Sequence, residues 1–380
     1  MNPLEQIILN EFPQKDEIVY LNHAAVAPWP LRTATAVRQF AEENVVTGAM
    51  HYPVWVKKET ELRYQCQRLL NAPSFEDIAL LKNTSEALSV VACGINWKTG
   101  NNVVSINQEF PSNRIVWQAQ QRHGVEFREV DIINTATPEQ ALMDACDRNT
   151  RVLAVSSVQF GTGFRLDLEI LGDYCRQNNV LFCVDAIQSI GAYAVDVQKI
   201  HADFVMADAH KWMLGPEGVA VFYCNSRVRD ELKLNQFGWH MVEDCGNYDR
   251  KDWEIARSAR RFECGSSNML GIHALSASLS LIEEVDIDVI EEKIRDKIDY
   301  LIEYLTRDRR IRLLTPRNPQ RRAGILTFTI DGLNMANLHR KLMDNNIICA
   351  HRMGGIRFSP HFYTSQEKID KALEILSISI

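Results

Sequence analysis

The stretch DFVMADAHKWMLGPEGVAVFY, residues 203–223, places one lysine between two apolar runs. Residues 203–206 and 218–223 have the composition of buried strands, and Lys211 lies in the segment that joins them. An unpaired ammonium is costly to bury. Lysine is also the side chain that forms Schiff bases, and desolvation lowers its pKa and exposes the nucleophilic amine. The stretch therefore predicts a chemically active lysine between two buried strands.

Further apolar runs alternate with helix-length segments through the middle of the chain. Five of them read as strands and occupy residues 78–81, 103–106, 125–130, 151–156 and 180–184. Helical patterns lie between most of these runs, for example at 85–93 and 168–178. Strands that alternate with helices predict an α/β fold, in which helices cover both faces of a mostly parallel, seven-stranded sheet.

The pattern changes after about residue 265. Long helices are expected at 270–284 and 289–307, short strands at 324–330 and 347–350, and a last helix at 365–376. We therefore predict two domains. Residues 18–264 form the large one, and residues 1–17 together with 265–380 form a smaller α+β domain.

Composition narrows the function classes. The net charge of −7 disfavours a nucleic-acid partner, because phosphate backbones require a basic face. No window approaches the roughly 20 apolar residues of a membrane span, and the first residues do not resemble a signal peptide. The nine cysteines form no CxxC pair, which favours reduced thiols in the cytoplasm and no metal site.

A carboxylate stands at the end of one predicted strand. Asp185 follows the run 180–184, and ligands of open α/β sheets bind beyond the carboxyl ends of the strands. There it could pair with a protonated pyridine nitrogen and keep such a ring electron-accepting. The alternative is an N-cap for a helix that begins at Ala186. Gln188 could donate a hydrogen bond to a phenolic oxygen of the same ring.

A second strand end offers a possible phosphate site. Asn83, with Glu86 three residues later, resembles a capping box that opens a helix. Helix N-termini attract phosphate, and Thr84 and Ser85 add hydroxyl groups. A plain helix start is the alternative.

Two further residues fit a site for an aromatic cofactor and an anionic substrate. Phe110 follows the run 103–106 and could stack on a pyridine ring, or it could be a buried loop aromatic. Arg357 has apolar neighbours, so its guanidinium needs an anionic partner. That partner is either a substrate carboxylate or an internal ion pair.

Together these residues resemble the class V aminotransferase family of fold-type-I pyridoxal-phosphate enzymes. Its members include cysteine desulfurases, isopenicillin-N-epimerase-like proteins and kynureninases. The resemblance runs from residues 20–25 to Arg357 and the closing helix, and it is strongest at 185–188 and 210–216. It implies pyridoxal 5'-phosphate as the cofactor, an amino acid or similar amine as the substrate, and a homodimer.

The resemblance implies roles around the cofactor ring. Lys211 is the lysine that forms the Schiff base (aldimine) and moves the substrate α-proton. Asp185 is the partner of the pyridine nitrogen, and Gln188 is the partner of the phenolic oxygen. Phe110 stands where the family places a ring-stacking residue, which is often histidine.

The resemblance also implies roles at the phosphate. Thr84 and Ser85 match the phosphate-binding turn, and His210 is a further phosphate contact. Residues 261–266 resemble the segment that reaches the phosphate of the neighbouring subunit. Ser266 is therefore expected to act in trans within the homodimer.

The expected substrate contacts are Arg357, Gln159, Asn22 and His23. Arg357 matches the arginine that binds the substrate α-carboxylate. Gln159 occupies the place of the usual asparagine, and Asn22 and His23 belong to the segment in which the resemblance begins.

Two departures from the family pattern bear on the chemistry. Asp208 stands where serine is common, and we expect it to point away from the phosphate, which it would repel. Desulfurases carry a nucleophilic cysteine on a loop ahead of the C-terminal arginine. Here Cys349 falls on a predicted strand, and no cysteine lies between it and Arg357. We therefore expect no enzyme-bound persulfide.

The predicted reaction begins when Lys211 removes a proton from the substrate α-carbon. We favour epimerase-like or C–S-lyase-like chemistry, with conventional transamination as the alternative. A pyridoxal-phosphate-binding protein with little catalysis is a different class of function. It is disfavoured because a carrier would not need Arg357 beside Lys211 and Asp185.

Overall fold

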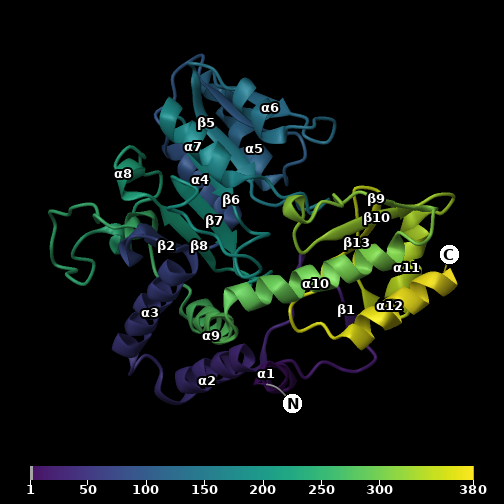
Figure 1. Cartoon of the computed structure of the whole chain (residues 1–380). Coiled ribbons are helices and arrows are strands. Elements are labelled where there is room, and N and C mark those ends of the chain that lie inside the picture. Colours follow the sequence, from purple (N-terminus) through teal and green to yellow (C-terminus); the bar gives the residue numbers. More distant parts are fainter. Residues whose placement is uncertain (1–2, 380) are drawn as a thin grey trace.

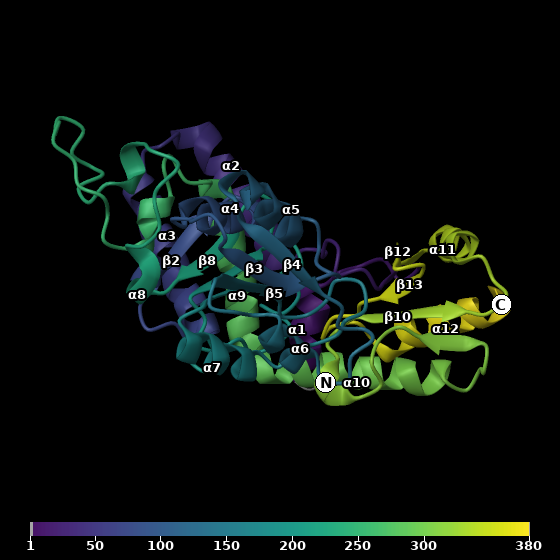
Figure 2. The same ribbon diagram turned by 90° about the horizontal axis from the view of Figure 1, so that it is seen from above.

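The computed structural model describes residues 3–379. A large lobe surrounds a seven-stranded sheet, and a smaller lobe, which contains the C-terminal helices and a four-stranded sheet, lies beside it (Figures 1 and 2). The predicted two-domain arrangement is therefore present in outline. The division at residues 18–264 stays a prediction, and positions 1, 2 and 380 lie outside the described residues.

The seven predicted strands form one sheet in the order β2-β8-β7-β6-β5-β3-β4. Their pairing is parallel except at β8, which is antiparallel to both β2 and β7. The mostly parallel sheet is therefore confirmed. The strands are β2 (Ile78–Leu81), β3 (Asn102–Ile106), β4 (Glu126–Val130), β5 (Thr150–Ser156), β6 (Leu181–Asp185), β7 (Phe204–Asp208) and β8 (Ala220–Cys224).

Both faces of this sheet are buried. In β6, Phe182 and Val184 enter one hydrophobic cluster, whereas Leu181 and Cys183 enter another. Alternate residues of a strand point to opposite faces, so each cluster is the core on one side of the sheet. The covering helices of the large lobe are α4 (Thr84–Gly94), α5 (Ser112–Gln118), α6 (Pro138–Asp144), α7 (Leu168–Asn178) and α8 (Ser226–Arg229).

Two long helices, α2 (Leu31–Thr47) and α3 (Tyr52–Leu70), lie outside the predicted elements. Both pack against α9 (Met269–Val285), as Figure 1 shows. Short 3-10 helices occupy η1 (Phe75–Asp77), η2 (Ala119–His123), η3 (Trp239–Met241), η4 (Ala259–Phe262) and η5 (Pro319–Arg321).

The smaller lobe has the predicted α+β character. Its sheet has the order β12-β13-β10-β9, and β1 pairs separately with β11, which ties the N-terminal segment to this lobe. The predicted strand at 347–350 is divided at Cys349 into β11 and β12. The elements are α1 (Pro3–Glu11), β1 (Val19–Tyr20), α10 (Ile287–Leu305), β9 (Ile311–Leu313), β10 (Leu326–Ile330), α11 (Met335–Asp344), β11 (Ile347–Ile348), β12 (Ala350–Arg352), β13 (Gly355–Phe358) and α12 (Gln366–Ser379).

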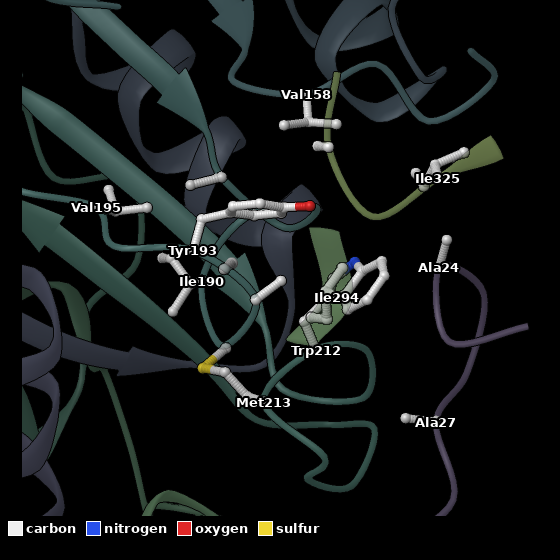
Figure 3. Packing of buried hydrophobic residues seen from close by; sticks show 14 of the residues in the cluster. Ala24, Ala27, Val158, Ile190, Tyr193, Val195, Trp212, Met213, Ile294 and Ile325 are labelled. Atoms are coloured by element: carbon white, nitrogen blue, oxygen red, sulfur yellow. The ribbon is translucent and has the colours of Figure 1, made fainter. Parts of the chain in front are cut away.

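The residue after Lys211 anchors the lysine turn. Trp212 is fully buried, and Figure 3 shows its ring beside Ile294 of α10. Its Nε1 donates to Gln188 Oε1 at 2.8 Å. Gly191 has φ +93°, and a Cβ there would lie 2.4 Å from the carbonyl oxygen of Trp212. Glycine at 191 is therefore required both by the backbone conformation and by this close approach.

Candidate active site

A cavity of about 290 Å³ opens at the carboxyl ends of the parallel strands. This is where open α/β sheets bind their ligands. Each of β2, β3, β5, β6 and β7 ends at it, and the N-terminal segment and the β12–β13 hairpin close it from the smaller lobe. Its lining residues are Ala24, Ala25, Thr84, Ser85, Phe110, Ser112, Phe160, Asp185, Ile187, Gln188, Asp208, His210, Lys211, Arg352 and Arg357.

Lys211 lies in this cavity with 8% of its surface exposed. Burial lowers the pKa of its ammonium group to about 8, Asp185 opposes the shift, and Arg357 adds to it. Its Nζ lies 5.7 Å from the centroid of the Phe110 ring. The amine is therefore available near neutral pH in a position that faces an aromatic side chain.

Asp185 is the last residue of β6 and is 2% exposed. Burial raises the pKa of its carboxyl group to about 6, although the Ile187 N–H and the charge of Lys211 lower it. Its Oδ1 accepts a hydrogen bond from Ile187 N at 3.0 Å. Residues 187–189 form a turn, so the alternative of an N-cap for a helix that begins at Ala186 is wrong.

Gln188 is held in a fixed orientation. Its Oε1 accepts from Trp212, and its Nε2 donates to the carbonyl oxygen of Ala24 at 3.1 Å. One amide hydrogen remains for a ligand oxygen, since an amide nitrogen carries two. The same side chain joins the lysine turn to the N-terminal segment.

The predicted capping box at α4 is confirmed. Asn83 Oδ1 accepts from Glu86 N at 2.8 Å, and Glu86 Oε2 accepts from Lys82 N at 2.6 Å. The hydroxyl of Thr84 is buried without a hydrogen-bond partner, and that of Ser85 contacts Ser112 Oγ at 2.8 Å. A helix N-terminus and its hydroxyl groups thus face the cavity, as a phosphate site requires.

His210 and Asp208 lie together at the cavity wall. Their Nδ1 and Oδ1 atoms are 3.2 Å apart, but the geometry is not that of a hydrogen bond. Asp208 lines the cavity at the end of β7, and the expectation that it points away from the phosphate stays a prediction.

The two aromatic residues of the site contact each other. The rings of Phe110 and Phe160 are 5.3 Å apart and nearly perpendicular. Phe110 is 43% exposed, so it is not a buried loop aromatic. Its ring has an open face for stacking.

Arg357, on β13, is 2% exposed and forms no ion pair within residues 3–379. The alternative of an internal ion pair is therefore wrong. Its Nη1 donates to the Phe160 carbonyl oxygen at 2.7 Å, and its Nη2 donates to Asn22 Oδ1 at 3.4 Å. Its Nε has no partner. A buried guanidinium in this state is suited to an anionic ligand.

The cavity residues fit pyridoxal phosphate. Buried polar atoms without a hydrogen-bond partner occur here on Thr84, Asp208, His210 and Arg357. Such atoms are rare in folded proteins, and a ligand can satisfy them. Hydroxyl groups for a phosphate, a carboxylate for a ring nitrogen and an amine for an aldehyde all face one space.

Four predicted contacts lie outside the lining of this cavity, and one of them, Asn22, accepts a hydrogen bond from Arg357 instead. His23 is fully buried, and its ring nitrogens contact the Ser359 carbonyl oxygen at 2.8 Å and Tyr363 Oη at 2.6 Å. Its substrate contact has no support, because both nitrogens already have partners. Gln159 is 2% exposed, and neither atom of its amide has a partner. Ser266 is exposed and lines a separate hollow with Lys82.

Sequence reasoning did not single out three residues of the site. Ser112 and Phe160 follow strand ends, as Phe110 does, so their positions relative to the strands carried the signal. Arg352 reaches the cavity from the far end of the chain, and only the pairing of β12 with β13 places it there.

A further residue supports the site from behind. Glu109 is buried and accepts from Ser156 N at 2.6 Å, and Ser156 lies beside Asp185 in the sheet. Burial raises the pKa of the Glu109 carboxyl to about 8.

Comparison with known proteins identifies relatives over the whole chain. A probable cysteine desulfurase of Methanothermobacter thermautotrophicus is 30% identical, over 97% of this chain and 96% of that protein. A probable cysteine desulfurase of Pyrococcus abyssi is 28% identical, over the same shares of the two chains.

Solved structures show the same fold. A cysteine desulfurase of Thermococcus onnurineus superposes with a TM-score of 0.87 at 24% identity, over 100% of this chain and 98% of that one. A cystine C–S lyase in complex with cysteine persulfide superposes with a TM-score of 0.88 at 22% identity, over 96% of this chain and 99% of the other.

The family profile of class V aminotransferases matches residues 19–372, which include every predicted site residue. The cofactor and fold expected from the sequence agree with that match. The chain belongs to the class V aminotransferase family and is a pyridoxal-phosphate-dependent enzyme.

Proposed function

We propose that this enzyme is a C–S lyase, which cleaves the bond between the β-carbon and sulfur of a cysteine derivative. The bound cofactor supplies an electron-accepting ring for the α-carbon. The balanced reaction consumes the amino acid and water, and it yields pyruvate, ammonia and a thiol. The sulfur leaves with the electron pair of the broken bond and takes up a proton.

The residues of the cavity have distinct tasks in this reaction. Arg357 orients the substrate through its α-carboxylate. The amine of Lys211 accepts the α-proton, since its lowered pKa makes it a base near neutral pH. Asp185 holds a proton at the ring nitrogen by staying ionised beside it. Gln188 and Phe110 fix the plane in which the α-carbon must lie.

One observation carries the choice of a lyase over a persulfide-forming desulfurase. Arg352 ends β12 and Gly355 begins β13, so only Met353 and Gly354 separate the two strands. Such a turn has no room for a loop that carries a nucleophile. None of the residues that line the cavity is a cysteine.

The nearest cysteine in sequence does not replace that nucleophile. Cys349 is 3% exposed, and burial raises the pKa of its thiol to about 12. A protonated thiol is a poor sulfur acceptor. Released sulfur therefore has no protein thiolate to receive it in this cavity.

The test is a product balance with purified holoenzyme. Cysteine and S-substituted cysteines are supplied in turn, and pyruvate, alanine, ammonia and released thiol are measured. We expect pyruvate and thiol in equal amounts and no persulfide on the protein by mass spectrometry. Alanine with a protein persulfide would refute the lyase and support a desulfurase.

The same experiment separates the remaining classes. A keto acid that retains the substrate side chain, with the cofactor left in its amine form, would identify transamination. Inversion of the α-carbon without elimination would identify an epimerase. Both alternatives stay predictions. The absence of cofactor absorbance from the purified protein would refute the whole assignment.

We also propose that the enzyme is a homodimer with Ser266 acting in trans. Apolar side chains are exposed along α3 and on the residues just before it, where Met50 is 71% exposed. Others are exposed on the segment after α8, where Tyr248 is 78% exposed. That segment projects from the large lobe in Figure 2. Large exposed apolar patches mark protein interfaces. Ser266 is exposed and is not among the residues that line the Lys211 cavity of its own chain.

Mixing two inactive variants tests this arrangement. A mixed dimer combines one Lys211→Ala subunit with one Ser266→Glu subunit. If Ser266 acts in trans, one of its two sites contains both a native Lys211 and a native Ser266. We expect activity to return on mixing and subunit exchange. Continued inactivity in mixed dimers would place Ser266 in its own subunit's site.

A cytoplasmic location also stays a prediction, which cell fractionation can test. Within the described residues, no helix is long and apolar enough to cross a membrane.

A further inference from the structure

Two arginines share one face of the β12–β13 hairpin. Arg357 pairs with Ala350, and Arg352 pairs with Gly355. Paired residues in a sheet point to the same side, as do residues two apart in one strand. Residues 350, 352, 355 and 357 therefore face the same way, and the two arginines stand roughly 7 Å apart along the strands.

The two arginines differ in depth. Arg357 is 2% exposed, whereas Arg352 lies beside the two-residue turn and is exposed. Both line the cavity that contains Lys211. Arg352 therefore stands at the mouth and Arg357 at the base of the same space.

Arg352 has no acidic partner among residues 3–379. Its Nη1 donates a hydrogen bond to the carbonyl oxygen of its neighbour His351, at 2.8 Å. Its charge nevertheless reaches the site, since it helps to lower the pKa values of Arg357 and of Lys211. Two unpaired cations in one cavity disfavour each other, and an anionic ligand between them would remove that cost.

Other charged groups of the cavity have roles in the proposed reaction, whereas Arg352 has none. Arg357 is assigned to the α-carboxylate, Asp185 to the ring nitrogen, and the start of α4 to the phosphate. Arg352 arises from the opposite lobe to α4, next to Arg357. A substituent that extends from the β-carbon toward solvent would pass Arg352 at the mouth of the cavity.

We infer that Arg352 is a specificity-determining residue that binds a second anionic group, at the far end of the sulfur substituent of the substrate. The preferred substrates are then cysteine derivatives whose leaving group carries a carboxylate. This chemistry includes S-carboxyalkyl cysteines, which would release a thiol, and the disulfide of two cysteines, which would release a hydropersulfide. The inference rests on the proposed lyase function, and it names the class of leaving group.

The test compares two ligands that differ in one charge. S-carboxymethyl-L-cysteine and S-carbamoylmethyl-L-cysteine have nearly the same size, but only the first carries a distal carboxylate. Dissociation constants are measured by calorimetry in cofactor-loaded Lys211→Ala protein, which removes turnover. Values of kcat/KM are measured in the native holoenzyme. L-cystine is the third ligand in both assays.

We expect the carboxymethyl ligand to bind about tenfold more tightly than the carbamoylmethyl ligand. Arg352→Gln should abolish this preference and leave the binding of the carbamoylmethyl ligand unchanged. Arg352→Lys should keep most of it. The control is Arg307→Gln, which removes an exposed arginine that lies outside the cavity and pairs with Glu303 in the native chain. It should leave the affinities for both ligands unchanged. Arg357→Gln should weaken both ligands equally.

If Arg352→Gln prefers the carboxymethyl ligand over the carbamoylmethyl ligand as strongly as the native sequence does, the inference is overturned. A preference that Arg352→Gln abolishes, in an enzyme that yields no pyruvate from any ligand, would refute the lyase and leave the anion site standing. A higher kcat/KM for cystine than for the carboxymethyl ligand in the native holoenzyme would identify the disulfide as the better substrate. The reverse would identify the simple carboxyalkyl substituent.

Discussion

The lowered pKa of Lys211 predicts how the cofactor-free enzyme reacts with aldehydes. A shift from 10.5 to about 8 leaves roughly one amine in ten unprotonated at pH 7, against about one in three thousand for an ordinary lysine. Lys211 should thus react with formaldehyde and borohydride roughly 300-fold faster than an unshifted lysine of equal access. The assay is peptide mapping of methylated lysines against pH, with the exposed Lys251 as internal comparison.

Two variants should move the pH midpoint of the Lys211 labelling in opposite directions. Arg357→Gln removes a cation that disfavours the ammonium, so the pKa of Lys211 should rise. Asp185→Asn removes the carboxylate that favours the ammonium, so the pKa should fall. A labelling midpoint near 10.5 in the native sequence, or shifts of the wrong sign, would refute the reasoning.

The same shift predicts a pH-dependent stability. Because the folded pKa is lower than the unfolded one, the unfolded state binds more protons between pH 8 and 10.5, and stability gains with pH across that window. Below it, cofactor-free Lys211→Met should be more stable than the native chain by up to about 3 kcal/mol. Urea unfolding at pH 7 and at pH 10.5 measures the difference, which should vanish at the higher pH.

Three further predictions concern cofactor binding, catalysis and folding. Asp185→Asn should lower kcat about 100-fold or more while the cofactor stays bound, measured by initial rates and absorbance; near-native kcat would contradict its role. Phe110→Ala should raise the cofactor dissociation constant about three- to tenfold, because ring stacking contributes ~0.5–1.5 kcal/mol, and an unchanged constant would show that the ring does not stack. Arg63→Met leaves the buried Glu263 and Glu59 without the guanidinium that lies 2.7 Å and 2.6 Å from them. It should cost about 3–5 kcal/mol of unfolding free energy in urea titrations, and a loss below about 1 kcal/mol would contradict this.

The fold was predictable where burial leaves a clear pattern. Strands buried on both faces read as continuous apolar runs, so all seven were located to within a few residues. Helices α2 and α3 were missed because they are amphipathic and lie partly exposed, with Val45 87% exposed and Val46 79% exposed. Each packs one side against α9 and leaves further apolar side chains exposed, so the apolar residues do not form the one-sided pattern of an ordinary core helix.

The site was predictable where its residues follow strand ends. Lys211, Asp185 and Thr84 stand at fixed places relative to buried strands, and parallel strands bring their carboxyl ends together. His23 and Arg352 show the limit of this reasoning. Whether a side chain from another lobe faces the cavity depends on the hairpin register and on partners such as Tyr363, which are far away in sequence.

The short turn between β12 and β13 also shows how this fold could acquire a different chemistry. Met353 has φ +50° and Gly354 has φ +76°, the paired left-handed conformations of a tight hairpin turn. Each doubling of loop length costs only about 0.6 kcal/mol in closure entropy. A cysteine-bearing loop grafted between Arg352 and Gly355 should therefore be tolerated and would place a thiol over the same cavity. Retention of sulfur on the protein, rather than its release to solution, would then depend on the length of one loop.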